Sequence, residues 1–257
     1  MSGAPFTHEH YAFMLRAGRE AGYRFATFDE IDRLRGDGSY ACLIRHDCDN
    51  DLVAARDLAR IEAELGVRAT YFVMIRSALY NLLAPPVSAL VHEIVGLGHR
   101  LGLHFDEAPC RDAAPDEVSR RVDDERAWLA REFGQPIDVV SFHQPSPRVL
   151  ANEVRLNCLN TYDRVDMKGL HYLSDSNLRF RSETPLECFE RRTHRLLHIL
   201  LHPEWWTQEP MPLDSKWDLM MAHNVGLMQD SLLAREDTFK RRRTVSFAME
   251  RAPCGKS

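Results

Sequence analysis

The sequence lacks any long hydrophobic run. None of its 257 residues belongs to an uninterrupted apolar stretch of about 18 residues, the length that a membrane-spanning helix needs. Residues 1–22 also contain no apolar stretch of signal-peptide length. We therefore expect no membrane span and a cytoplasmic location.

Closely spaced cysteines and an excess of positive charge are missing as well. The six cysteines are Cys42, Cys48, Cys110, Cys158, Cys188 and Cys254. They form no CxxC pair, which is unlike a disulfide framework or a cysteine-rich zinc site, so we expect reduced thiols. The formal net charge is -5, whereas nucleic-acid-binding proteins usually carry a strong basic excess. Nucleic acid is therefore not an expected partner.

Short apolar runs alternate with amphipathic stretches along most of the chain. Strands are expected at 40–46, 69–75, 99–105, 139–143, 156–162 and 196–202, and helices at 52–65, 87–97, 116–133 and 213–233. This alternation predicts an α/β fold with a parallel sheet whose faces are covered. The number of strands favours a (β/α) barrel, regular or incomplete, over an open sheet. We expect one domain, 1–257, with a helical extension over 1–38 and the barrel over 39–257.

Side chains suited to metal binding and proton transfer follow four of these strands where each strand ends. Asp47 and Asp49 end the first strand, His104 the third, His143 the fourth and His202 the last clear one. The carboxyl ends of barrel strands meet at one rim, so these five side chains should converge. Two carboxylates on the same side of one strand divide naturally into a metal ligand and a general base. Two histidines and a carboxylate around a cation are typical of hydrolytic or oxidative metal sites.

Each of these residues also has a structural interpretation. Asp49, Asn50 or Asp51 could cap the helix that follows the first strand. A lone histidine is more often a satisfied polar residue than a ligand. Trp205 and Trp206 could pack against the last helix or stack on a sugar ring. The convergence of five side chains on one rim favours the metal site.

In the order of these motifs, the sequence resembles the polysaccharide deacetylase family, also called carbohydrate esterase family four, from about Tyr40 to Trp206. The resemblance implies a distorted (β/α)7-type barrel and a divalent metal held by one aspartate and two histidines. The run His46-Asp47-Cys48-Asp49 is similar to the first family motif, which implies that Asp47 is the base and Asp49 a ligand. The segment that ends at His104 is similar to the strand leading into the second motif, which makes His104 a ligand.

The second ligand histidine of the family falls on Ala108 here, so one ligand is missing. His143 stands where the family usually has arginine and could reach the metal instead. Glu107 or Asp106 could also coordinate it, or the metal site could be lost. We favour His143 because its position at a strand end points it inward.

Two further motifs complete the resemblance. Asp175, within the run 174–177, would orient the catalytic histidine or base, and His202, at the end of a hydrophobic strand, would be the general acid. The residues that we expect to contact the substrate are Arg45, Gln144, Trp205 and Trp206.

Together, these assignments predict a metal-dependent hydrolase, a divergent cytoplasmic family member, that removes an acetyl or formyl group from an amino sugar. The cofactor would be one divalent metal ion, zinc first, although iron, cobalt, nickel and manganese accept the same ligands. The expected location favours a nucleotide-linked or lipid-linked amino sugar of surface-glycan biosynthesis over a cell-wall polymer. A non-sugar amidase, an inactive glycan-binding homologue and an oxygenase remain alternatives, the second because of Ala108.

Overall fold

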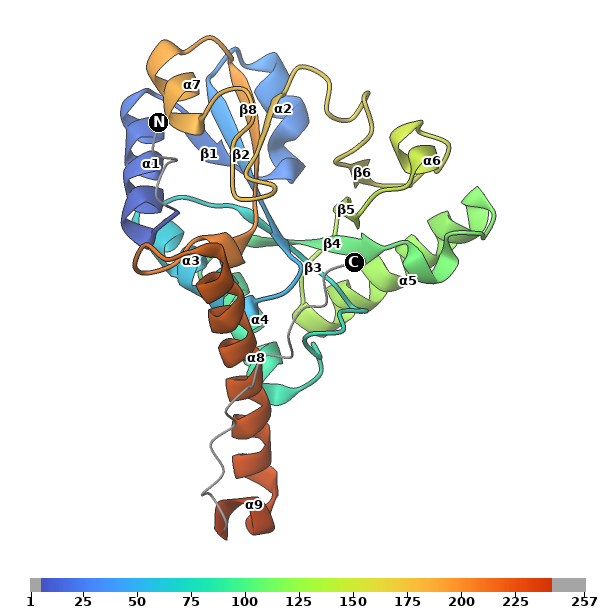
Figure 1. The fold of residues 1–257 in the computed structure, drawn as a ribbon. Helices are drawn as coiled ribbons and strands as arrows, with labels where there is room; N and C mark the ends of the chain where they lie inside the picture. The colour runs from blue at the N-terminus through green and yellow to red at the C-terminus, as the bar shows by residue number, and fades with distance from the viewer. Residues whose placement is uncertain (1–5, 242–257) are drawn as a thin grey trace, which may run out of the picture.

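The predicted parallel sheet is present in the computed structural model, which describes residues 6–241 (Figure 1). The strands are β1 Arg24–Ala26, β2 Ala41–Cys48, β3 Thr70–Val73, β4 Arg100–Asp106, β5 Val139–His143, β6 Leu159–Asn160, β7 His171–Ser174 and β8 Leu196–Leu201. Their order is β6-β5-β4-β3-β2-β8-β7, with β1 paired to β2 beside this path, and every pair is parallel. The order forms an incomplete, distorted barrel, which confirms the predicted fold class.

Strand β2 is the centre of this sheet. One edge of β2 pairs with β8 from Ala41↔Leu196 to His46↔Leu201, and its other edge is shared by β1 and β3. All eight residues of β2 are buried, as expected for a parallel strand covered on both faces. The strand β1 lies inside the predicted helical extension, so that prediction is incomplete. Three residues are too short to show a strand periodicity in the sequence.

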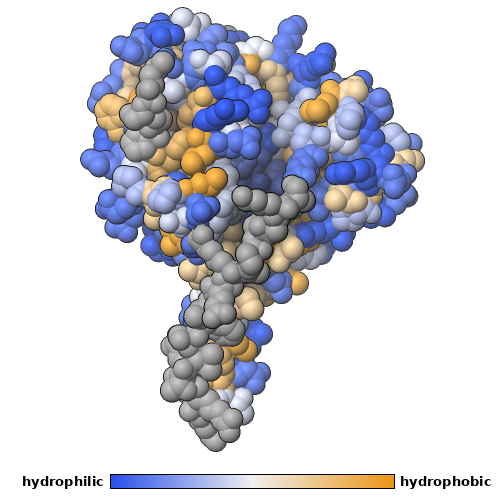
Figure 2. Space-filling view, in the orientation of Figure 1, coloured by the Kyte–Doolittle hydropathy of each residue, from blue (hydrophilic) through white to orange (hydrophobic). Residues whose placement is uncertain are grey.

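Helices lie on both sides of the sheet. They are α1 His8–Glu20, α2 Ile31–Gly36, α3 Leu52–Glu64, α4 Pro85–Gly96, α5 Pro115–Phe133, α6 Pro147–Leu150, α7 Pro185–Arg191, α8 Leu213–Arg235 and α9 Asp237–Arg241, with 3-10 turns η1 Phe28–Glu30, η2 Ala108–Cys110 and η3 Pro203–Trp205. Most of α8 projects beyond the sheet (Figure 1), and apolar surface is visible along this projection in Figure 2. Met228 and Leu232 are among the exposed apolar side chains of α8. None of the helices within residues 6–241 is long and apolar enough to span a membrane.

The first helix is fastened to the segment that follows β8. Thr7 forms a parallel bridge with Thr207, and the His8 amide donates to the Thr207 carbonyl over 2.9 Å. The Thr7 side chain also caps α1 by accepting from the His10 amide over 3.2 Å. Because β8 ends just before His202, α1 supports the loop next to that residue.

The described cysteines are Cys42, Cys48, Cys110, Cys158 and Cys188, and all are free thiols; Cys254 lies outside the described residues. The expectation of reduced thiols therefore holds for the part of the chain that the structure describes.

Close packing beneath the central strand depends on Gly102 of β4. A Cβ atom at this position would lie 2.5 Å from the nearest carbon of the Phe72 ring, which is fully buried. The ring of Phe72 also carries the guanidinium of Arg45, 5.5 Å from its centroid. Because Gly102 has no side chain, the Phe72 ring can occupy the space below the candidate site.

We expect Gly102→Ala to lower the free energy of unfolding by about 1–3 kcal/mol, because the added methyl group overpacks the core at Phe72. Gly96→Ala is the matched control, since a Cβ atom there meets nothing within 4 Å and the residue lies in α4. Urea unfolding of both variants measures the difference, and equal stabilities would contradict this account of the packing.

Candidate active site

Asp49, His104 and His143 bring three ligand atoms together near the carboxyl ends of β2, β4 and β5. The atoms lie within 4.8 Å of one another. His104 Nε2 is 2.7 Å and His143 Nδ1 is 3.5 Å from the same oxygen, Asp49 Oδ1. The residues lie in β4, at the end of β5 and just after β2, so the parallel sheet itself places them side by side.

The surroundings of these three residues fit a divalent cation. Asp49 Oδ1 is buried and makes no hydrogen bond of acceptable geometry, although two imidazole nitrogens lie close to it. Ligands that point at a common cation, rather than at one another, have this arrangement. His104 Nδ1 lies 3.1 Å from Ser141 Oγ, the kind of support that a metal-binding histidine usually receives on its other ring nitrogen.

The other proposed ligands are engaged elsewhere. Glu107 is buried and accepts from Arg148 Nε over 2.7 Å and from the Ser146 amide over 3.3 Å. Asp106 accepts from the Ala108 amide over 2.9 Å. The geometry therefore favours His143 over both acids as the third ligand.

The structure shows which residue of the acidic run 47–51 caps the helix α3. Asp51 is the N-cap of α3 and accepts from the amides of Val53 and Ala54, over 2.9 and 3.0 Å. Asp49 is therefore not needed as a cap, and its carboxylate is available to the histidines.

Asp47 is held by a buried arginine. Arg45 Nε lies 2.7 Å from Asp47 Oδ1, and Arg45 Nη2 lies 2.6 Å from Asp47 Oδ2. Burial alone would raise the pKa of Asp47, but the charges of Arg45 and His104 outweigh burial and lower it below its usual value. Arg45 is fully enclosed. The prediction that Arg45 contacts substrate is wrong, because the guanidinium is buried and donates its hydrogen bonds to Asp47 and other buried groups.

His202 and Asp175 form a second charged pair on the same rim. His202 Nδ1 lies 2.7 Å from Asp175 Oδ1, and the His202 amide lies 3.1 Å from both carboxylate oxygens. Burial would lower the pKa of His202, but the hydrogen bond and charge of Asp175 raise it to about 10. His202 therefore keeps its proton at neutral pH.

The two tryptophans after His202 are packed rather than open. Trp206 is 1% exposed and donates from Nε1 to Asp175 Oδ2 over 3.0 Å, so it helps to fix the carboxylate that orients His202. Trp205 packs edge-on against Trp217 at 5.0 Å between centroids. A sugar-stacking role is wrong for Trp206, which has no free ring face, and the packing of Trp205 favours the structural alternative.

Gln144 follows His143 and is exposed, with a left-handed backbone at φ 48°. This conformation turns the chain sharply at the end of β5. A contact between Gln144 and substrate stays a prediction.

Some supporting residues were not predicted from the sequence. Ser141 contacts both the Arg45 guanidinium and His104, and Thr161 Oγ1 accepts from Arg45 Nη1 over 2.9 Å. A serine inside an apolar strand is a usable signal, because a buried hydroxyl needs a partner. Glu204 is buried next to the site, which raises its pKa to about 8, and accepts from Asn50 Nδ2 over 2.6 Å.

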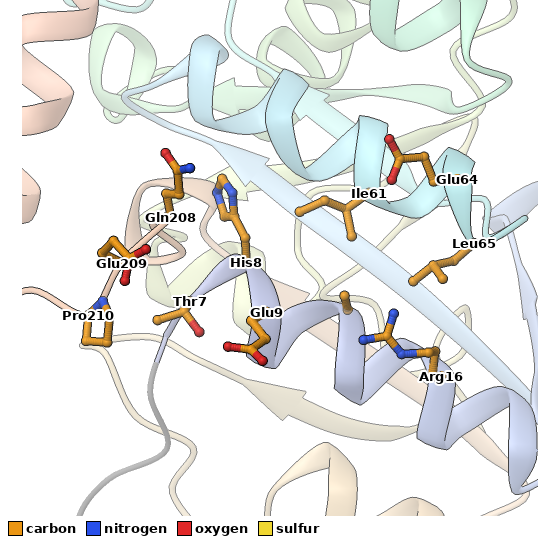
Figure 3. A pocket seen from close by; sticks show the side chains of 11 residues that line it. Thr7, His8, Glu9, Arg16, Ile61, Glu64, Leu65, Gln208, Glu209 and Pro210 are labelled. Carbon is orange, nitrogen blue, oxygen red and sulfur yellow. The ribbon is translucent and has the colours of Figure 1, made fainter.

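A separate hollow lies between α1, α3 and the loop near Gln208 (Figure 3). Its lining includes His8, Glu9, Arg16, Glu64 and Gln208. None of the clustered metal-type residues lines it, so it is not the candidate active site.

We expect Asp175→Asn to lower the pKa of His202, which histidine NMR titration measures directly. In the folded wild type the raised pKa means that the ion pair stabilises the fold fully below about pH 6.5. That stability is lost as pH rises from there towards about 10, by about 1.4 kcal/mol for each pH unit in this window.

The Asp175→Asn variant should therefore lose this alkaline dependence of its unfolding free energy. Asp106→Asn, an acid outside the pair, is the control and should keep it. An unchanged His202 titration in Asp175→Asn would refute the assigned cause.

Replacing Arg45 by methionine should cost roughly 3–5 kcal/mol of unfolding free energy, because Asp47 is left as an unpaired buried charge. Adding Asp47→Asn to Arg45→Met should recover part of that loss, which urea unfolding would detect. A single Arg45→Met variant as stable as the wild type would show that the pair does not hold the site.

No protein-family model and no curated protein matches the chain. Among solved structures it is similar to the deacetylase PplD of Streptococcus pyogenes in complex with acetate, at 15% identity and a TM-score of 0.48, over 75% of this chain and 80% of that one. It is also similar to the peptidoglycan deacetylase PdaC of Bacillus subtilis, at 12% identity and a TM-score of 0.43, over 80% and 98% of the chains.

A third similar structure is a CE4 family pseudoenzyme from Bacillus anthracis, at 14% identity and a TM-score of 0.40, over 75% and 62% of the chains. At such identities and TM-scores, a likeness transfers neither activity nor substrate to this chain. The first two of these structures are described as deacetylases and the third as a member of the CE4 family.

Proposed function

We propose that the chain is a divalent-metal-dependent amide hydrolase that removes an acetyl or formyl group from an amino sugar. The observation that carries the proposal is the Asp49, His104 and His143 cluster, with Asp47 and the His202–Asp175 pair on the same rim. A ligand set, an ionised carboxylate and a protonated histidine are the parts that hydrolysis of an amide requires.

Asp49, His104 and His143 would hold the cation, and we propose zinc first, since it accepts two imidazoles and a carboxylate. A bound divalent cation polarises an acyl carbonyl and makes a nearby water more acidic. Every other part of the reaction falls to side chains of this chain.

Asp47 would be the general base. Its Oδ2 lies 3.8 Å from His104 Nε2, so the carboxylate faces the cluster while Arg45 fixes its orientation. As the oxygen of water bonds to the acyl carbon, Asp47 would take the proton that the water loses.

His202 would be the general acid. Its raised pKa, about 10, keeps a proton ready on the imidazolium at neutral pH. When the C–N bond breaks, that proton would go to the nitrogen of the leaving amine, which departs poorly as an anion. The products would be a free amino sugar and acetate or formate.

For the substrate we propose a nucleotide-linked or lipid-linked amino sugar of surface-glycan biosynthesis. The proposal rests on the predicted cytoplasmic location. The free thiols of the described cysteines support a reducing compartment. Cell fractionation tests the location independently of the chemistry.

We expect Asp47→Asn and His202→Gln each to lower kcat on the N-acylated amino sugar at least about 100-fold, as loss of an acid or base usually does. Release of acetate or formate measures the reaction. Asp49→Asn should abolish activity and should reduce the bound divalent metal by one equivalent. Elemental analysis of protein purified without chelator or affinity metal measures the bound metal.

Asp106→Asn is the matched control, because Asp106 is a carboxylate beside the cluster that does not belong to it; metal and activity should both remain. Wild-type turnover in Asp47→Asn would refute the assignment of the base. Hydrolysis of cyclic ureides but not of amino sugars would favour a non-sugar amidase. Glycan binding without turnover in the metal-loaded protein would favour an inactive homologue.

A further inference from the structure

A second group of metal-type side chains lies at the opposite end of the strands. His171 is the first residue of β7, and His194 precedes the start of β8. Glu183 and Cys188 come from the turn before α7 and from α7 itself. Because the strands are parallel, their amino ends form the rim opposite the proposed active site, and the proposed function uses none of these residues.

The donor atoms of this group are close together. Single ligand atoms of His171, Glu183 and Cys188 all lie within 4.8 Å of one another. Glu183 Oε1 is 2.7 Å from His171 Nε2 and 3.4 Å from His194 Nε2. The two imidazole rings stack in parallel, 3.5 Å between centroids and 1° between planes. The stacked rings place both Nε2 atoms near one carboxylate oxygen, but parallel rings cannot both point at one cation, so His171 is the candidate ligand and His194 packs against it.

The contacts within the group do not satisfy all of its atoms. His171 Nε2 is buried and makes no hydrogen bond of acceptable geometry, even though Glu183 Oε1 is only 2.7 Å away. A simple histidine–glutamate ion pair would align an N–H with the carboxylate. The misaligned contact repeats what is seen between Asp49 and His104, where the residues fit a cation.

The position of Cys188 is fixed by local structure. Thr184 caps α7 through a capping box with Glu187, and Pro185 starts the helix. These features place Cys188 on the buried face, with Phe189 packed against Gly18 of α1.

We propose that His171, Glu183 and Cys188 form a second metal site for a zinc-class divalent cation. A thiolate, an imidazole and a carboxylate are donors that zinc accepts, whereas magnesium and calcium prefer sites made of oxygen alone. On binding, the Cys188 thiol releases one proton to solvent and its sulfur becomes a ligand of the cation.

The role of this site would be structural. Its three residues come from β7, from the turn before α7 and from α7 itself, and β7 is the last strand on its side of the sheet. A cation would fasten the turn before α7, and α7 itself, to this edge strand. The wide spacing of the cysteines excludes a cysteine-rich zinc site, but not a site with a single cysteine.

The test is a cobalt(II) titration of the full-length apoprotein carrying Asp49→Asn, which silences the first site. A thiolate–cobalt charge-transfer band in the near ultraviolet reports only a site that contains cysteine. We expect the band to saturate at one equivalent and to disappear when zinc displaces cobalt. Cys188→Ser should abolish the band, whereas Cys158→Ser, which removes a thiol outside the group, should leave it unchanged.

Glu183→Gln and His171→Gln are milder variants at partly exposed positions and should weaken cobalt binding at least about 10-fold. They decide the question if Cys188→Ser does not fold. Zinc should also raise the Tm of the Asp49→Asn protein, and at the same zinc concentration it should raise the Tm less when Glu183→Gln is added. Absence of the band in the parent protein, or its persistence in the folded Cys188→Ser variant, would overturn the proposal. Because catalytic activity is not measured, failure here leaves the proposed function standing.

Discussion

A guanidinium buried in the middle of a protein constrains everything around it, because each of its N–H groups needs a partner and its charge needs a counter-charge. Arg45 lies in the central strand β2 and is fully enclosed. Asp47 supplies the charge, Thr161 and Ser141 accept hydrogen bonds, and the Phe72 ring lies beneath the guanidinium. These partners come from different strands and loops, so the arginine fixes how those segments meet. Ser141 contacts both the Arg45 guanidinium and His104, so the buried arginine also helps to fix the position of this proposed ligand.

Asp47 and His202, which we propose as base and acid, have pKa values that their surroundings shift in opposite directions. Arg45 holds the pKa of Asp47 low, whereas Asp175 raises the pKa of His202. In these buried positions the carboxylate remains ionised and the imidazole remains protonated at neutral pH because each has its own charged partner. Environments that push neighbouring pKa values apart are typical of sites where one group accepts a proton and another donates it.

The part of the site that could be predicted from the sequence depends on strand periodicity. Asp49, His104 and His143 follow strong apolar runs, and parallel strands bring such positions to one rim, so their convergence follows from the fold class alone. The strands β1 and β7 escape detection, because three residues and a run containing histidine and serine show no clear alternation.

Burial is harder to predict than position. Arg45 and Trp206 stand in motifs beside catalytic candidates, which suggests substrate contact, yet both are enclosed and act on Asp47 and Asp175 instead. The cluster around Cys188 leaves no signal in the sequence, because its members are irregularly spaced and meet only after the chain has folded. Contacts between side chains that are far apart in the sequence are therefore what could not be predicted from the sequence.

The pairing of β2 with β8 has a consequence for how the protein is made. As the chain leaves the ribosome, β2 is finished early, but one of its edges has no strand to pair with until β8, the final strand, emerges. An unpaired edge of apolar residues is a template for wrong association, and large parallel sheets fold slowly. A chain truncated before β8 should therefore leave this apolar edge of β2 unpaired and be prone to aggregate.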